Sequence, residues 1–200
     1  MRIDLEGGGY CELQQGWLST ESAARLMGDL IGEIPWSQRH IRIAGKAVAE
    51  PRLSAWHGDP DAVYWYSGVE HQPLPWTAAL TELRQKLEIE LQQPFNSVLA
   101  NRYRDGRDAM GMHADDEREL GPEPCIASVS LGMTRRFVLA PKKGRPGEKR
   151  ELLLTHGSLL VMAGPVQRDW KHGVPREAHV FQERINLTYR QVLASSRPKR

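Results

Sequence analysis

Five polar residues in the second half of the chain have the side chains needed to bind a metal ion and an organic acid. His113 and Asp115 are two positions apart, His172 follows later, and Arg184 and Arg190 lie near the C-terminus. Two imidazoles and one carboxylate can hold a divalent iron on one face and leave the opposite positions open. A guanidinium matches a carboxylate with two parallel hydrogen bonds, so it can anchor a dicarboxylic acid beside the metal. A protein that combined both features would be an oxygenase.

Spacing alone does not single out this histidine and aspartate. Residues two apart on a strand project from the same face, so His113 and Asp115 could reach one metal, but His57 and Asp59 repeat the pattern. Asp59 precedes a proline in a turn-like segment, where an aspartate usually serves the backbone. His172 taken by itself is better explained by a structural role, because a lone histidine is more often structural than a ligand. The residues thus leave two candidate pairs.

The segment 184–190 alternates between polar and apolar residues. On a strand, the polar residues would share one face and the apolar residues the other: Arg184, Asn186, Thr188 and Arg190 against Ile185, Leu187 and Tyr189. Such a polar face could line a site. An antiparallel edge strand with a solvated polar face fits the pattern as well.

The elements that must position these residues form two groups. Apolar residues spaced three and four apart predict helices at Ser19–Ile34, after the capping candidates Ser19 and Thr20, and at Trp76–Gln92, before Pro94. From Ser97 onward, short apolar or alternating runs separated by Gly, Pro and Asp predict strands, as in a β-sandwich or jelly roll: 98–103, 126–131, 136–139, 152–154, 159–162 and 185–189. The fold class is therefore α+β.

Composition indicates one domain over residues 1–200, because 40% hydrophobic residues in a chain of this length can bury a sizeable core. The net charge of +2 permits a polyanionic partner without requiring one. Cys11 and Cys125 do not form a disulfide framework, which favours a reducing, cytoplasmic location. With no apolar run long enough to span a membrane, we expect a soluble protein, and a monomer.

Five ordered blocks of the chain resemble the AlkB-like Fe(II)- and 2-oxoglutarate-dependent dioxygenases. They are Asn-Arg-Tyr-Arg-Asp-Gly (101–106), His-Ala-Asp-Asp-Glu-Arg-Glu-Leu (113–120), Ile-Ala-Ser-Val-Ser-Leu-Gly (126–132), His-Gly-Ser-Leu-Leu-Val-Met (156–162) and the segment 184–190. In detail the chain is most similar to the vertebrate member that repairs alkylated double-stranded DNA. The resemblance implies a double-stranded β-helix (jelly-roll) core over 96–193, preceded over 1–95 by N-terminal helices packed against it and a nucleotide-recognition segment, with a basic tail at 194–200.

The resemblance also implies roles for individual residues. His113, Asp115 and His172 match the catalytic Fe(II) triad, which decides against the pair His57 and Asp59. Arg184 matches the arginine that binds 2-oxoglutarate, with Arg190 also able to orient a metal ligand. Supporting co-substrate contacts are implied for Asn101, Tyr103, Asn186, Thr188 and Arg190, and substrate contacts for Tyr64, Tyr66, Ser67, Asp116 and Glu117.

The function that the resemblance implies is oxidative demethylation of N-alkylated bases such as 1-methyladenine and 3-methylcytosine, with 2-oxoglutarate and dioxygen as co-substrates. The partner would be alkylated DNA, and possible alternatives are RNA, a protein, a small molecule or a non-catalytic nucleic-acid-binding module. A base inside a duplex must be flipped out to reach a buried metal, and Tyr66 would stack on it. Candidate phosphate contacts are Arg52, Arg102, Arg104, Arg107, Lys142, Lys143, Arg145, Lys171 and the tail.

One position departs from the double-strand-specific relative. That relative wedges a bulky apolar residue into the duplex ahead of a Gly-Lys pair, whereas Ala44 precedes Gly45 and Lys46 in this chain. Alanine cannot fill a vacated base stack. We therefore expect either a preference for single strands or a different wedge, such as Ile43.

Overall fold

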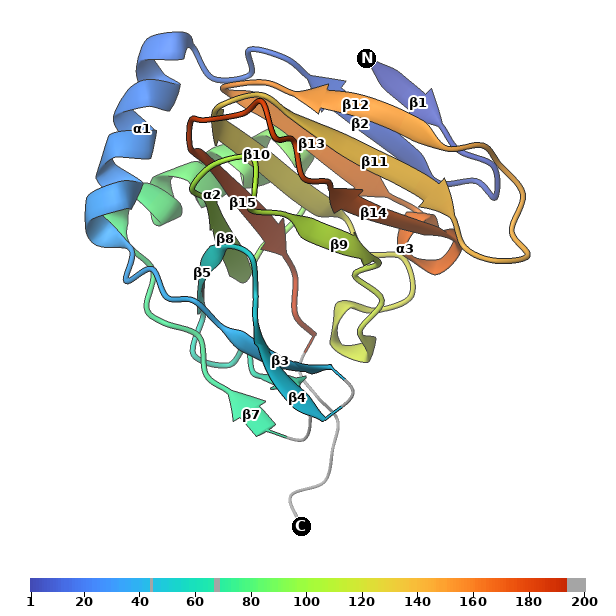
Figure 1. The fold of residues 1–200 in the computed structure, drawn as a ribbon, viewed down its shortest axis with the longest axis horizontal. Coiled ribbons are helices and arrows are strands. Elements are labelled where there is room, and N and C mark those ends of the chain that lie inside the picture. Colours follow the sequence, from blue (N-terminus) through green and yellow to red (C-terminus); the bar gives the residue numbers. More distant parts are fainter. Residues whose placement is uncertain (44, 67–68, 194–200) are drawn as a thin grey trace.

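Two antiparallel sheets packed face to face form the centre of the computed structural model, which describes residues 1–43, 45–66 and 69–193 (Figure 1). The larger sheet has the order β1 (Arg2–Asp4), β2 (Tyr10–Gln14), β13 (Ser158–Ala163), β10 (Ile126–Gly132), β15 (Arg184–Arg190), β8 (Ser97–Tyr103) and β5 (Leu53–Gly58). The smaller has the order β12 (Arg150–Leu154), β11 (Arg135–Pro141), β14 (Trp170–Val174) and β9 (Met110–His113). This arrangement confirms the predicted jelly roll.

The two predicted helices lie almost where the sequence placed them. Helix α1 (Thr20–Glu33) is capped by Ser19, and α2 (Ala78–Leu91) is capped by Thr77 and ends at Gln92, which adopts a left-handed conformation. Both pack against one face of the larger sheet, in a core that joins Leu30 and Leu83 to residues of β8, β10, β13 and β15. A second apolar core fills the space between the sheets. Two short turns, η1 (Arg118–Leu120) and α3 (Val166–Asp169), complete the helical segments of the described residues.

Strand β15 is central, because it pairs with β10 on one side and β8 on the other. The predicted alternation is confirmed: Ile185, Leu187 and Tyr189 are buried in the core under the helices, whereas the polar residues line a cavity between the sheets. The edge-strand interpretation is therefore wrong.

Other strands carried no clear sequence signal. β1 and β2 extend the larger sheet beyond β13, and β5 closes its opposite edge. Two hairpins, β3 (His40–Ile43) with β4 (Lys46–Ala49) and β6 (Tyr64–Tyr66) with β7 (Val69–His71), lie below the sheets in Figure 1. Within the described part of the chain, no helix combines the length and apolar character needed to cross a membrane.

Candidate metal centre

Three side chains that can ligate a metal converge between the sheets. One ligand-type atom from each of His113, Asp115 and His172 lies within 4.8 Å of the other two. The histidines are direct partners across strands β9 and β14, and their ring centroids are 4.4 Å apart. Asp115 Oδ1 lies 3.6 Å from His113 Nε2, and Asp115 Oδ2 lies 4.0 Å from His172 Nε2. The donor set and its spacing suit a divalent metal with open coordination positions.

Asp115 is not on the strand that carries His113. Strand β9 ends at His113, so the expectation that one strand presents both side chains is wrong for Asp115. Arg190 holds the buried carboxylate instead, with Nη2 2.8 Å and Nε 3.2 Å from Oδ2. The sequence prediction that Arg190 orients a metal ligand agrees with this contact.

The protonation states in this cluster suit metal binding. Burial alone would raise the pKa of Asp115, but Arg190 and the two histidines outweigh it and lower the pKa to about 2. Burial lowers the pKa of His172 to about 3 against the opposing charge of Asp115. At neutral pH the carboxyl is therefore ionised and this imidazole neutral, as metal ligation requires. His113 Nδ1 lies 2.9 Å from the Gly111 carbonyl, which assigns the proton to Nδ1 and leaves the Nε2 lone pair facing Asp115.

The rival pair has structural partners. His57 Nδ1 lies 2.6 Å from the Pro75 carbonyl, and Asp59 accepts hydrogen bonds from Trp76 Nε1 at 2.7 Å and Arg84 Nη1 at 2.8 Å. Among the described residues, His57 and Asp59 belong to no group with metal-ligand geometry. His57 lies on β5 and the Asp59 carboxylate bonds to side chains, so the turn interpretation is wrong for His57, whereas a structural role for the pair agrees with these contacts.

The cavity beside the cluster contains a buried cation with unfilled hydrogen-bonding capacity. Arg184 is 1% exposed, and Nη2 donates to Ser130 Oγ at 2.9 Å and to Asn186 Oδ1 at 2.7 Å. Its Nε and Nη1 have no hydrogen-bond partner among the described residues. Burial lowers the pKa of Arg184 to about 10, so the guanidinium is still charged at neutral pH. A buried, incompletely paired guanidinium is costly and favours an anionic ligand.

The predicted co-substrate residues all line this one cavity: Asn101, Tyr103, Arg184, Asn186, Thr188 and Arg190, together with the three ligand-type residues. Their polar groups are ordered by neighbours, since Ser128 Oγ donates to Asn186 Oδ1 at 3.0 Å. Arg52 Nε donates to Asn101 Oδ1 at 2.8 Å, which leaves the amide nitrogen of Asn101 free for another acceptor. Sequence reasoning missed Ser128 and Ser130, although their alternation on β10 opposite β15 was a usable signal.

The predicted substrate residues lie partly outside what the structure describes. Ala44 and Ser67 are outside the described residues, as are the side chains of Ile43, Tyr64 and Tyr66. Asp116 is exposed and bonded to Lys142 Nζ at 2.7 Å, and Glu117 is half-buried at the start of η1. The substrate contacts of these residues therefore stay predictions.

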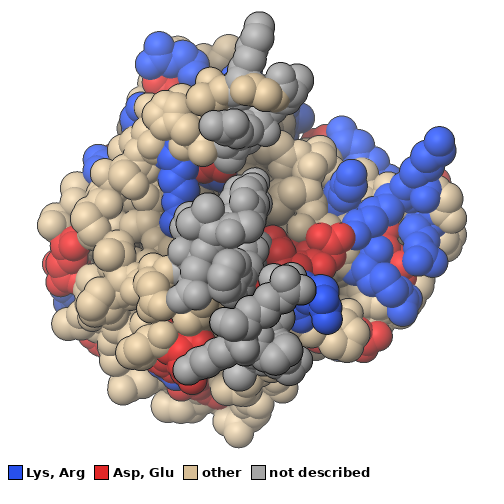
Figure 2. All heavy atoms as spheres, turned by 90° about the horizontal axis from the view of Figure 1, so that it is seen from below, with Lys and Arg blue, Asp and Glu red and all other residues tan. Residues whose placement is uncertain are grey.

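The basic residues proposed for phosphate binding differ in availability. Arg52 is only 8% exposed and paired with Glu50, so its predicted phosphate contact is wrong. Lys142 is committed to Asp116 and to the Gln167 carbonyl. In contrast, Lys143 and Lys171 are exposed. Figure 2 shows basic side chains gathered at the right-hand edge, where the β11–β12 loop lies in Figure 1.

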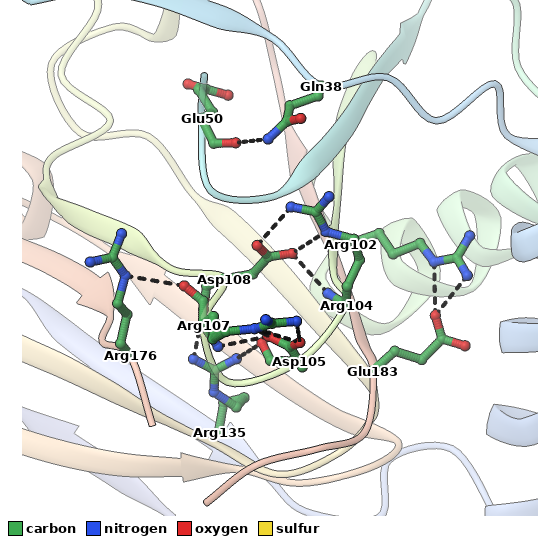
Figure 3. A network of polar contacts seen from close by, with 10 residues as sticks. All are labelled: Gln38, Glu50, Arg102, Arg104, Asp105, Arg107, Asp108, Arg135, Arg176 and Glu183. Carbon is green, nitrogen blue, oxygen red and sulfur yellow. Dashed lines mark hydrogen bonds and ion pairs between the residues drawn. The ribbon is translucent and has the colours of Figure 1, made fainter. Parts of the chain in front are cut away.

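A knot of polar contacts joins the loops next to the cavity (Figure 3). The guanidinium of Arg135, 1% exposed, donates to Glu177 Oε2 at 2.9 Å and to the carbonyls of Asp108 at 2.9 Å and Pro175 at 2.6 Å. These contacts tie the β8–β9 loop to the β14–β15 loop. The first loop leads into β9, which carries His113. The second loop joins β14, which carries His172, to β15, which carries Arg184, so these contacts hold together two loops that connect strands of the site.

Comparison with known proteins agrees with this geometry. Residues 10–190 match the model of the 2OG-Fe(II) oxygenase superfamily. The chain belongs to this superfamily. As a member it is an Fe(II)-dependent oxygenase that uses 2-oxoglutarate and dioxygen as co-substrates, and the three-residue cluster fits Fe(II).

Curated relatives place this superfamily member among AlkB-like proteins. The alpha-ketoglutarate-dependent dioxygenase alkB homolog 3 of Mus musculus is 38% identical over 194 residues, covering 92% of this chain and 67% of the relative. The DNA oxidative demethylase ALKBH2 of Homo sapiens is 40% identical over 163 residues, covering 78% and 62%. The solved structure of OsALKBH1 gives a TM-score of 0.62 at 20% identity, covering 90% of this chain and 97% of that one. The last comparison supports the fold alone.

Proposed function

We propose that the protein removes N-alkyl groups from alkylated nucleic acid, most simply in DNA repair. The observation that carries the proposal is the cluster of His113, Asp115 and His172 beside the incompletely paired Arg184, in a chain 40% identical to a DNA oxidative demethylase. The two curated relatives differ in name but share the oxidative chemistry that this site could perform.

In this proposal, His113, Asp115 and His172 hold Fe(II), and Arg184 binds the distal carboxylate of 2-oxoglutarate. The Nε and Nη1 groups of Arg184, which have no partner among the described residues, are charged donors from which a carboxylate could accept hydrogen bonds. Asn101 and Tyr103 complete the polar wall, and Arg190 keeps the Asp115 carboxylate in place.

With Fe(II) held by His113, Asp115 and His172, the site would supply oxidation by dioxygen: one oxygen atom would enter an N-methyl C–H bond and the other would enter succinate, as 2-oxoglutarate loses carbon dioxide. The resulting N-hydroxymethyl base loses formaldehyde, and from a cationic lesion such as 1-methyladenine or 3-methylcytosine a proton is released as the neutral base forms. The protein's task is to present the methyl group and exclude water. Tyr64 and Tyr66 are the proposed stacking residues for a base flipped out of its strand.

The direct test is anaerobic reconstitution with Fe(II) and 2-oxoglutarate, followed by dioxygen and an oligonucleotide that contains 1-methyladenine or 3-methylcytosine. We expect formaldehyde and unmodified base in equal amounts. Single-stranded and double-stranded DNA and RNA are compared in parallel, because Ala44 predicts either a preference for single strands or a different wedge residue, such as Ile43. Succinate formation without demethylation of any of these polymers would count against a nucleic-acid substrate.

A second measurement separates a nucleobase from a protein or small-molecule substrate. For Tyr66→Ala we expect demethylation to fall much more than substrate-free 2-oxoglutarate turnover, because stacking contributes about 1–3 kcal/mol per base. Trp56→Ala serves as a control aromatic change on β5. Equal losses of both activities in Tyr66→Ala would contradict its role in base binding.

A further inference from the structure

Asp115 lies in a segment that no strand holds. Strand β9 ends at His113 and the next regular element, η1, begins at Arg118. The residue is nevertheless 3% exposed, so its main-chain N–H needs a partner inside the protein. That partner is a side chain: the Asp115 N–H donates to Gln167 Oε1 at 3.0 Å.

Gln167 is well suited to hold this N–H. It is 1% exposed, and its Nε2 lies 3.6 Å from Met162 Sδ, a weak acceptor. The opposite amide orientation would set N–H groups against the Asp115 N–H, so the contact itself assigns the oxygen to Asp115. The side chain is therefore fixed at both ends.

The short turn that carries Gln167 is itself braced. Lys142 Nζ donates to the Gln167 carbonyl at 2.9 Å, and the Lys142 main-chain N–H donates to the Asp169 carbonyl at 2.8 Å. The same ammonium bonds to Asp116 Oδ2 at 2.7 Å. Lys142 thus holds α3 and the segment around Asp115 together, and β14 with His172 follows α3 directly.

We propose that Gln167 is a positioning residue for Asp115. Arg190 fixes the carboxylate through Oδ2 and Gln167 fixes the main chain, so Oδ1 is held toward His113 Nε2, 3.6 Å away. The inference rests on the proposed role of Asp115 as a metal ligand. It adds a residue outside the cavity wall that determines how tightly the site binds its ion.

The test measures Mn(II) binding by electron paramagnetic resonance, without 2-oxoglutarate or dioxygen. Gln167→Met removes the acceptor at nearly constant volume, and we expect Mn(II) affinity to fall at least about 10-fold, as for other partners of metal ligands. Gln167→Glu restores an acceptor oxygen and should recover most of the affinity. Glu88→Met is the matched control. Glu88 lies on α2, behind the larger sheet, and its Oε1 accepts a hydrogen bond from the main-chain N–H of Phe95.

A purely structural role of Gln167 predicts the same effect on Mn(II) binding in Gln167→Met and Glu88→Met. The positioning role predicts a difference between these two variants. Both Met variants should lower the thermal midpoint, but only Gln167→Met should weaken Mn(II) binding. Wild-type affinity in Gln167→Met, or in Gln167→Asn if the Met variant does not fold, would overturn the inference. His172→Ala separates this outcome from failure of the metal centre: if it also binds Mn(II) normally, the proposed function fails as well.

Discussion

His172 and His57 are both buried histidines, and burial lowers the pKa of each. Only His172 faces a carboxylate and a second imidazole. At the scale of single residues, this difference in neighbours gives one histidine a chemical role and the other a structural one. Sequence spacing offered no means of telling them apart.

We predict that His172→Ala abolishes tight Mn(II) binding and 2-oxoglutarate turnover. His57→Ala should keep both while lowering stability by about 1–3 kcal/mol, because the Pro75 carbonyl loses its partner. Metal titration and urea unfolding of the two variants check this. Loss of Mn(II) binding in His57→Ala with the fold intact would contradict the assignment.

Arg184→Met should weaken 2-oxoglutarate binding by on the order of 100-fold, or about 3 kcal/mol, because charge-assisted hydrogen bonding to the carboxylate is lost. Mn(II) binding should be unchanged, since Arg184 bonds to Ser130 and Asn186 and to none of the three metal-binding residues. Anaerobic calorimetry measures both quantities, with Mn(II) titrated into the metal-free protein and 2-oxoglutarate titrated into the Mn(II)-loaded protein. Arg102→Met is the control, because Arg102 pairs with Glu183 at the surface. Undiminished affinity in Arg184→Met would remove Arg184 from the anchor role.

At the scale of elements, the polar knot around Arg135 keeps two loops together. Gly106 allows their close contact: a Cβ there would overlap the Glu177 carbonyl, and the Gly106 N–H donates to the Val180 carbonyl at 2.8 Å. Glu177 Oε2 also accepts the Arg136 main-chain N–H at 3.1 Å. The loops therefore behave as one unit at the end of four strands.

Arg135→Met should destabilise the protein by about 3–5 kcal/mol, because it leaves the Glu177 carboxylate buried without its main cation. Burial alone would raise the pKa of Glu177, but hydrogen bonds from Arg136 and Arg135 outweigh it and lower the pKa. A carboxyl with a lowered pKa contributes stability above its unfolded pKa of about 4.3, and this is lost as pH falls through its folded pKa.

The difference in free energy of unfolding between the wild type and Glu177→Gln should therefore be constant near neutral pH and decrease below about pH 4. Urea unfolding at several pH values measures it. Glu151→Gln is a control at an exposed carboxylate, for which only a small gap is expected. A difference in unfolding free energy between the wild type and Glu177→Gln that increased on acidification would contradict the stabilising role of the ionised Glu177 carboxylate.

What the sequence could predict depended on local pattern. The alternation along β15 and the leucine spacing of α2 made the strand and the helix predictable, whereas alternation alone did not exclude an edge strand with a solvated polar face. Asp115 was assigned to the strand of His113 because the spacing of two residues does not show where a strand ends. Gln167 comes from a segment distant from Asp115, and the N-terminal strands are short, so local periodicity carried no signal for them.

At the scale of the whole molecule, basic side chains gather on one side of the face seen in Figure 2, near the β11–β12 loop. Each phosphate contact to a single strand should contribute about 0.7 to the slope of log affinity against log salt concentration. Lys143→Ala combined with Lys171→Ala should reduce that slope by about 1.4 if both bind phosphate.

Fluorescence anisotropy with a methylated oligonucleotide over a range of salt concentrations measures this slope. The control is Lys86→Ala, which also removes one positive charge per substitution. Lys86 lies on α2, behind the larger sheet, so the slope should not change. An unchanged slope in the double variant would exclude these two lysines from the nucleic-acid interface.

Tyr103 and Arg184 are direct partners in the pairing of β8 with β15, although most of the second half of the chain separates them in sequence. No unfolded or partly folded chain can present this pair, and strand pairings of such long range form slowly. The proposed co-substrate is thus a ligand of the completed sheet alone. By mass action, 2-oxoglutarate at 100 times its dissociation constant would stabilise the native state by about 2.7 kcal/mol, so the supply of this compound would help set how long each molecule survives.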